Sequence, residues 1–299
     1  AIGRTCRARL DRKIMRYSHA LRIGPVGFRI GSDWREPIAL LQQLYAAYPG
    51  IEAGIADATV RLEAARPWRR IIRPAVHIRG DYIIPDALPL PLAQGLLAAE
   101  MAMNLQVALG WRQHLLLHAS AVERGGRALV MVGASGSGKS TMAALLGEGD
   151  WRLMGDEFAM LNMGSGAIHA FPRLISLKNE SVPEMAARVG LERLGPISTG
   201  TPKGTIRHMV PRADAIVRMD EPALPALLLF PTFGGEPGLR AVPPSEAFMR
   251  LTESSTNYVA LGEPAFAALT DLIARVPAVA IGYGSSAEGM AAIESLWGE

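Results

Sequence analysis

The chain contains one cysteine, Cys6, among 299 residues. A single cysteine cannot form a disulfide within the chain, and no second Cys or His stands near it at zinc-ligand spacing, so neither a disulfide nor structural zinc is expected. This usage agrees with a reducing compartment. The basic segment 1–22 has no apolar core of the kind that a secretory signal contains, so a cytoplasmic location is the expectation.

Long hydrophobic runs are also missing. No charge-free segment reaches the roughly 18 residues of a membrane helix, and the candidate PIALLQQLYAAYPGI at 37–51 includes Gln, Tyr and Pro. No membrane span is therefore predicted. The formal net charge is only +3, and no aromatic-and-basic module accompanies it, so a nucleic-acid partner is not expected.

Lysine is the scarce cation. Only four of the 31 basic residues are lysines, at Lys13, Lys139, Lys178 and Lys203. A compact ammonium group suits phosphate and carboxylate contacts where a guanidinium fork would be too large. The lysines of the latter half are therefore candidate site residues, although chance alone could scatter four lysines in this way.

The pattern of predicted strands and helices changes near residue 110. Before it, period-two segments around 21–31 and 75–85 flank a helical pattern at 35–48, and 91–111 predicts a long helix. After it, strand and helix patterns alternate. The segment 114–133 predicts two strands joined by a turn near 123–126, 163–166 predicts a hairpin turn, and Ser181 and Glu184 match a capping box. We expect an α/β protein with a mixed N-terminal domain at 1–110 and a second domain at 111–299.

The segment GASGSGKS, Gly133 to Ser140, matches the phosphate-loop template G-x-x-x-x-G-K-[ST] between a strand and a helix. Glycines allow backbone amides to turn toward phosphate oxygens, and the helix N-terminus adds partial positive charge. Lys139 would reach the terminal phosphates, and the Ser140 hydroxyl would bind Mg²⁺. The expected nucleotide-binding residues are Gly133, Ala134, Ser135, Gly136, Ser137, Gly138, Lys139, Ser140 and Thr141.

An acidic pair follows at unusually short spacing. Sixteen residues separate Lys139 from Asp156, which leaves room for one short helix, a tight turn and a strand. The pattern places Asp156 and Glu157 at the end of that strand, facing the bound phosphates. Carboxylates there can hold Mg²⁺ and accept a proton from an attacking hydroxyl.

The order of His118, GASGSGKS and RLMGDE resembles HPr kinase/phosphorylase and its relatives, whose core is shared with phosphoenolpyruvate carboxykinase. The SLKN segment at Ser176–Asn179 and the KGT segment at Lys203–Thr205 look more like the HPr-kinase-related proteins of biosynthetic clusters, including lasso-peptide kinases. The resemblance covers about 115–179 well. It implies a phosphate-loop kinase core of this type.

The resemblance implies a role for each matching residue. His118 would assist at the phosphates, Asp156 would be the base and a metal ligand, and Glu157, which replaces the family's usual second Asp, would be a metal partner. Lys178 is then a nucleotide-binding candidate. The remaining catalytic candidates are Lys203 and Arg207, which lie in or just after a Gly- and Thr-rich loop, Ser198–Thr205, that would close over the nucleotide.

The leading hypothesis is an ATP- and Mg²⁺-dependent kinase acting on a hydroxyl, with serine of a peptide or protein, such as a lasso-type precursor, as the expected acceptor. A small-molecule kinase remains an alternative. So does a nucleotide-dependent regulatory module with slow ATPase activity, and a carboxykinase-like enzyme is a weaker reading. The N-terminal domain is a candidate acceptor-recognition domain, and homo-oligomerisation stays open.

Overall fold

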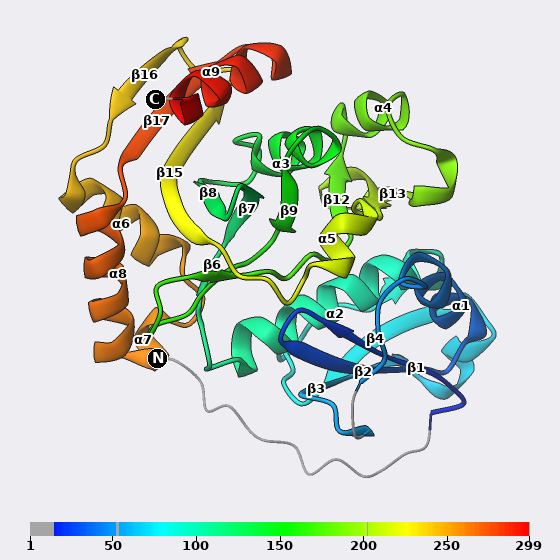
Figure 1. The fold of residues 1–299 in the computed structure, drawn as a ribbon. Coiled ribbons are helices and arrows are strands. Elements are labelled where there is room, and N and C mark those ends of the chain that lie inside the picture. Colours follow the sequence, from blue (N-terminus) through cyan, green and yellow to red (C-terminus); the bar gives the residue numbers. More distant parts are fainter. Residues whose placement is uncertain (1–14, 52–53, 202, 299) are drawn as a thin grey trace. The chain divides into compact units, whose positions relative to one another are not determined.

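The computed structural model describes residues 15–51, 54–201 and 203–298, and Figure 1 shows their elements. Cys6, Lys13 and the larger part of the basic segment 1–22 lie outside the described residues. The described chain is mixed α/β and divides into two compact units. One comprises the described residues up to Trp111 and Gly195–Thr205, and the other comprises Arg112–Leu194 and the described residues from Ile206.

The first unit is built on a sheet with the order β1-β2-β3-β4-β5. Its strands are β1 (Tyr17–Ile23), β2 (Val26–Ser32), β3 (Ala58–Ala64), β4 (Ala75–Gly80) and β5 (Leu90–Pro91). β1 and β2 form a tight hairpin because Gly24, with φ of 50°, accepts the backbone conformation of a two-residue turn. Between the parallel strands β2 and β3 lies α1 (Arg35–Leu44), and η2 (Pro67–Arg70) follows β3.

Helix α2 (Gly95–Gly110), preceded by the 3-10 turn η3 (Leu92–Gln94), packs against β3 and β4. By length and composition alone, Leu92–Gly110 could cross a membrane, but 61% of that window is buried inside the fold. Its Glu100 carboxylate is buried and accepts a hydrogen bond of 2.8 Å from the Tyr45 hydroxyl. This satisfied polar contact agrees with the core helix that the sequence predicts.

The second unit contains a six-stranded sheet with the order β16-β17-β15-β8-β7-β9, whose strands are labelled in Figure 1. Its strands are β7 (Ala119–Arg124), β8 (Arg127–Val132), β9 (Arg152–Gly155), β15 (Leu224–Phe233), β16 (Gly238–Ala241) and β17 (Ala278–Tyr283). β15 is parallel to β8 and β17, whereas β7 is antiparallel to both β8 and β9. Consequently β8, β9, β15 and β17 all run in one direction, and their carboxyl ends lie at one edge of the sheet.

Helices cover both faces of this sheet. On one face, Leu129 and Met131 of β8 pack in a core with α3 (Lys139–Glu148) and α9 (Ser286–Gly298). On the other face, Val130 of β8 packs with α6 (Pro244–Ser254) and α8 (Glu263–Arg275). Alternate residues of a strand point to opposite faces, so a continuous apolar run such as ALVMV serves both cores.

Smaller elements complete the chain. β6 (Leu115–Leu117), β10 (Ala159–Leu161) and β11 (Ile168–His169) form a sheet with the order β11-β10-β6, and β12 (Ile175–Lys178) pairs antiparallel with β14 (Gly204–Met209). The β10–β11 hairpin confirms the turn predicted at 163–166. The other elements are α4 (Ser181–Ala186), η4 (Leu191–Arg193), β13 (Leu194–Thr201), α5 (Ala213–Val217) and α7 (Tyr258–Leu261).

Three local expectations were wrong. The Ser181 hydroxyl does not cap α4; it donates to the Lys178 carbonyl and accepts from the Lys178 amide, both within the preceding turn. Residues 114–124 are not one strand, because the chain breaks at His118 between β6 and β7, which belong to different sheets. Ser198–Thr201 belongs to strand β13 rather than to a loop, in agreement with the strand preference of its β-branched threonines.

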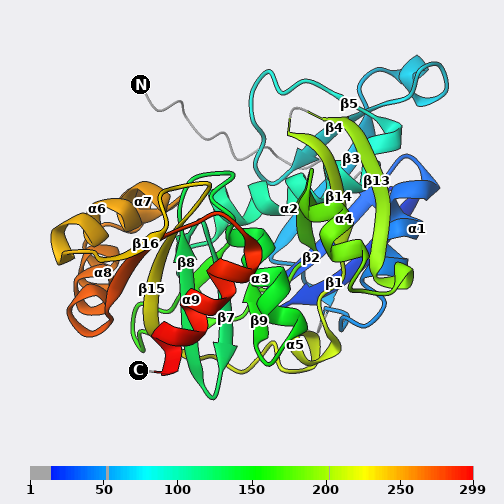
Figure 2. The ribbon, with the colours of Figure 1, turned by 90° about the horizontal axis from the view of Figure 1, so that it is seen from above.

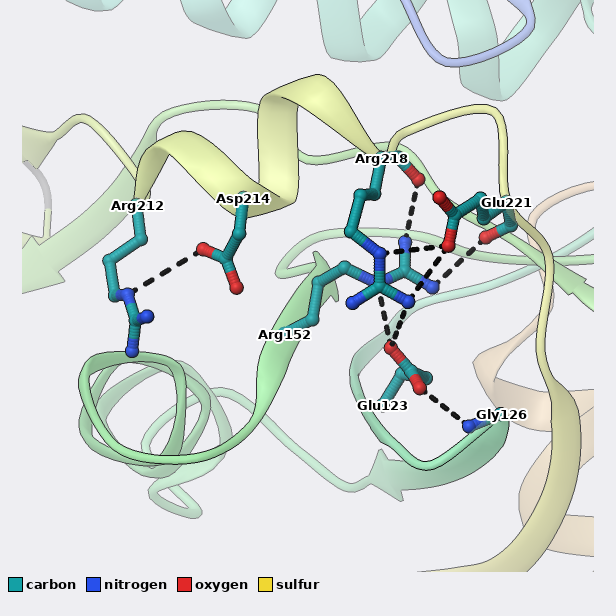
Figure 3. Close-up of polar contacts among 7 residues, drawn as sticks. All are labelled: Glu123, Gly126, Arg152, Arg212, Asp214, Arg218 and Glu221. Carbon is teal, nitrogen blue, oxygen red and sulfur yellow. Dashed lines mark hydrogen bonds and ion pairs between the residues drawn. The ribbon is translucent and has the colours of Figure 1, made fainter.

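A buried ion pair fixes β7 to β9 (Figure 3). Glu123 and Arg152 are cross-strand partners, with a 2.7 Å bond from Arg152 Nε to Glu123 Oε2. The remaining guanidinium nitrogens of Arg152 donate to the carbonyl oxygens of Arg218 and Glu221 at 2.8 and 3.0 Å. Although burial raises the pKa of Glu123, the Gly126 amide and Arg152 lower it overall. The charges are therefore compensated, and β9, the strand that precedes Asp156, is held in register.

Candidate functional site

The Gly-rich loop connects the end of β8 to the start of α3. Gly136 and Gly138 have φ of 88° and 95°, a left-handed conformation that side chains rarely adopt. A Cβ on Gly138 would lie 2.0 Å from the hydroxyl oxygen of Tyr283, so glycine is required there by packing as well. Ala134, Ser135 and Gly136 are exposed. The loop thus presents backbone amides and a helix N-terminus to solvent, as a phosphate cradle needs.

Lys139 is the buried cation of this loop. Its ammonium donates to the carbonyl oxygens of Gly133 and Ala134 at 2.5 and 2.9 Å. An ammonium has three donors, so one remains for a phosphate oxygen. Burial lowers the pKa of Lys139, while the nearby carboxylates of Asp156 and Glu157 oppose that change.

Asp156 follows β9 directly, at the same edge of the sheet as the loop. Its side chain is only 4% exposed. Ser120 Oγ lies 2.9 Å from Oδ1, and the Ser176 amide donates to Oδ2 across 3.4 Å. Burial and the neighbouring Glu157 raise the pKa of Asp156, whereas hydrogen bonds from the Ser140 and Ser120 hydroxyls lower it. The loop serine therefore lies close enough to the first acid to influence its pKa.

Glu157 and His118 form the outer part of the site. His118 Nδ1 lies 3.6 Å from Glu157 Oε2, and both side chains are partly exposed. Burial lowers the pKa of His118, partly offset by Glu157, and the charge of Lys139 lowers it further. These effects favour the neutral imidazole, which can accept or donate a hydrogen bond beside the carboxylate.

The remaining predicted cations are distributed differently. Lys178 ends β12, and its charge influences the pKa of Asp156, Lys139 and His118, so it lies within electrostatic reach of the acids. Arg207 lies on β14 opposite Leu177. Lys203 belongs to the first unit with Gly195–Thr205, and its role at the nucleotide stays a prediction.

Several neighbours of the loop were not anticipated from the sequence. The Phe233 amide and the Tyr283 hydroxyl both donate to the Ser137 carbonyl at 3.3 Å. The two rings meet edge to face with centroids 5.7 Å apart. Burial raises the pKa of Tyr283 to about 12, so its hydroxyl remains a donor at neutral pH. Phe233 and Tyr283 end β15 and β17, and Ser120 lies on β7. Only the order of the strands in the sheet could have identified these three residues as neighbours of the site.

The donor set fits a metal–nucleotide complex. Among the described residues, no group of three or more His, Cys, Asp or Glu side chains could hold a metal ion alone. Mg²⁺ commonly binds through one or two carboxylates together with substrate phosphates and water, and Ser140, Asp156 and Glu157 offer such partners. Ser137 Oγ is buried without a hydrogen-bond partner, which leaves a polar atom in the cradle for a phosphate oxygen.

Comparisons with known proteins give little. No protein-family model matches the chain, and no curated protein matches it. Among solved structures, the chain is similar to the Hpr(Ser) kinase/phosphatase from Coxiella burnetii, with a TM-score of 0.26 and 11% sequence identity over 60% of this chain and 90% of that one. The likeness is distant.

Proposed function

We propose that the chain is an ATP- and Mg²⁺-dependent kinase that transfers the γ-phosphoryl group to a hydroxyl, most simply that of serine in a peptide or protein. The observation that carries this proposal is the position of Asp156. A buried carboxylate, which accepts a 2.9 Å hydrogen bond from Ser120, lies at the sheet edge where the phosphate loop begins its helix. Phosphoryl transfer requires this pairing of a phosphate cradle with a metal-binding and proton-accepting group.

Each side chain then has a defined task. The amides of 133–140 and Lys139 hold the phosphates, and Ser140 with Asp156 and Glu157 would bind Mg²⁺, which neutralises phosphate charge. Asp156 accepts the proton as the acceptor oxygen forms its bond to phosphorus and the bond to the ADP oxygen breaks. His118 positions Glu157.

The acceptor class is the finer part of the proposal. A peptide acceptor, such as a lasso-type precursor, accords with the sequence resemblance, and the first unit would bind it. Incubation with ATP and Mg²⁺, with and without serine-containing candidate peptides, tests this. A kinase adds one phosphoryl group to the peptide, measured by mass, and ADP formation rises accordingly. ADP formation that no peptide or small alcohol changes would instead identify a regulatory ATPase.

The lysines provide a second test of the same proposal. Lys178→Ala should slow transfer more than it weakens nucleotide binding, because charge that develops during transfer is stabilised more than ground-state charge. Lys203→Ala should also slow transfer more than it weakens nucleotide binding if the Lys203 segment reaches the nucleotide. Arg207→Ala is measured beside both lysine variants, because Arg207 is the other candidate cation. Turnover at the wild-type rate in both lysine variants would contradict the role inferred from lysine scarcity.

A further inference from the structure

The first unit contains a pocket of about 770 Å³ beside the edge of its sheet. One wall is the segment that follows β3 and includes η2, with Arg66, Trp68, Arg69 and Arg73 among the lining residues. The other wall flanks the short edge strand β5 and includes Pro89 and Pro91. β4 and β5 can be followed in Figure 2. No part of the kinase proposal uses this pocket.

The lining is basic and has no counter-charge of its own. Three of its eleven residues are arginines, and none is acidic. Within the described part of the chain, no carboxylate forms an ion pair with these arginines. Arg69 donates to the Arg73 carbonyl at 3.2 Å, and the Arg66 guanidinium stacks over the Trp68 ring at 5.3 Å. Both contacts orient the guanidinium groups while leaving their positive charge uncompensated.

Apolar groups accompany the arginines. Trp68 is 54% exposed, and the adjacent Ile71 and Ile72 are 83% and 64% exposed. Arginine and tryptophan are the residues that most often dominate protein interfaces. Guanidinium groups bind carboxylates in a bidentate manner, and a wall of prolines and an aromatic ring suits an extended chain. A concave pocket favours a peptide over a flat lipid surface.

We propose that this pocket binds an extended, acidic and apolar peptide segment, whose carboxylates pair with Arg66, Arg69 and Arg73 while an apolar side chain packs on Trp68. This inference rests on the proposed function in one respect, since the segment would belong to the peptide acceptor. The pocket thus supplies affinity for a part of the acceptor that is distinct from the phosphorylated hydroxyl, and it selects acceptors by charge.

The test uses the full chain without ATP or Mg²⁺, so its outcome is independent of kinase activity. Fluorescence anisotropy follows fluorescein-labelled peptides of repeated Glu-Leu-Pro, with Gln-Leu-Pro and Lys-Leu-Pro repeats as matched probes. The glutamate peptide should bind at least about tenfold more tightly than the glutamine peptide and lose affinity as salt is added. Arg66→Glu and Arg69→Glu should each weaken it about tenfold or more.

Arg35→Glu is the matched control, because it makes the same charge change on exposed α1, outside the pocket, and should alter affinity less than about twofold. Equal binding of the glutamate and glutamine peptides would overturn the proposal. So would equal losses in Arg35→Glu and Arg69→Glu, which would indicate a general effect of net charge. Binding of phosphatidylserine vesicles, with no peptide binding, would assign the surface to membranes instead.

Discussion

Replacing Asp156 with asparagine separates a kinase from a protein that only binds nucleotide. The side chain is buried, and asparagine preserves its size and the oxygen that accepts from Ser120 at 2.9 Å. The weaker contact from the Ser176 amide to Oδ2, at 3.4 Å, loses its acceptor. The substitution therefore removes charge and basicity while leaving the packing nearly unchanged.

The kinetic effect should be large. Loss of a general base slows proton-coupled transfer by about 10²- to 10⁴-fold, which corresponds to roughly 3 to 5 kcal/mol in activation free energy. Nucleotide binding should survive in part, because the loop amides and the contacts of Lys139 to the Gly133 and Ala134 carbonyl oxygens remain. In the wild type, kcat/KM should fall as pH decreases through the raised pKa of this carboxyl, and Asp156→Asn should lose that acidic limb.

Acceptor phosphorylation at saturating ATP, measured beside a direct nucleotide titration, checks this reasoning. Glu157→Gln is the matched control, because it removes a partly exposed neighbouring carboxylate and should cost less turnover if Asp156 is the base. An Asp156→Asn protein with near-normal turnover would refute the assignment and shift the role to Glu157 or His118.

The same variant has a stability signature. A carboxyl whose pKa is higher in the folded than in the unfolded protein stabilises the fold below its unfolded pKa, near 3.9, and this contribution is lost as pH rises through the folded pKa. The nucleotide-free Asp156→Asn protein has no carboxyl at this position, so it does not lose this stability as pH rises. Its thermal midpoint should therefore equal or exceed that of the wild type at neutral pH, and the difference should shrink toward pH 4. A midpoint several degrees lower at neutral pH would contradict this.

The remaining predictions concern the loop, the buried ion pair and a buried histidine. Gly138→Ala should weaken nucleotide binding more than about tenfold and destabilise the fold by at least about 1 kcal/mol, since a left-handed backbone at a residue with a side chain alone costs that much. Adding Tyr283→Phe removes the hydroxyl that the new Cβ would meet, so it should restore part of the affinity. If affinity does not recover, the predicted clash is ruled out. Glu123→Gln leaves the buried Arg152 guanidinium without its charge partner and should lower the free energy of unfolding by about 3–5 kcal/mol in urea titrations, whereas a loss below about 1 kcal/mol would contradict the pairing. Burial lowers the pKa of His114 to about 4, so the free energy of unfolding should decrease as pH falls from 6.5 toward 4. His114→Phe should make the free energy of unfolding less dependent on pH in this range. The same pH dependence in the variant and the wild type would refute this role of His114.

The sequence by itself determined the local elements around the loop. Gly136 and Gly138 permit the left-handed turns, Gly125 and Gly126 permit the β7–β8 hairpin, and the short interval from Lys139 to Asp156 allows only one helix and one strand. These features depend on residues close together in the chain, so spacing and composition are sufficient to predict them. The mixed α/β class follows from the same alternation of patterns.

Local patterns were insufficient where distant partners compete. The break at His118 depends on β6 pairing with β10 while β7 pairs with β8 and β9. Likewise, the Ser181 hydroxyl bonds the amide and carbonyl groups of Lys178 in the preceding turn. The same hydroxyl is therefore not used to cap α4. No local sequence pattern assigns Gly195–Thr205, with Lys203, to the first unit.

Only the tertiary structure decided which strands surround the loop. β15 and β17 insert beside β8 from far along the sequence and bring Phe233 and Tyr283 to the Ser137 carbonyl. Several strands of this chain are similarly apolar, so their order cannot be derived from hydrophobic pattern. It is set by the requirement that both faces of the sheet be covered by helices at once, a condition that involves the whole second unit and appears in no single segment of sequence.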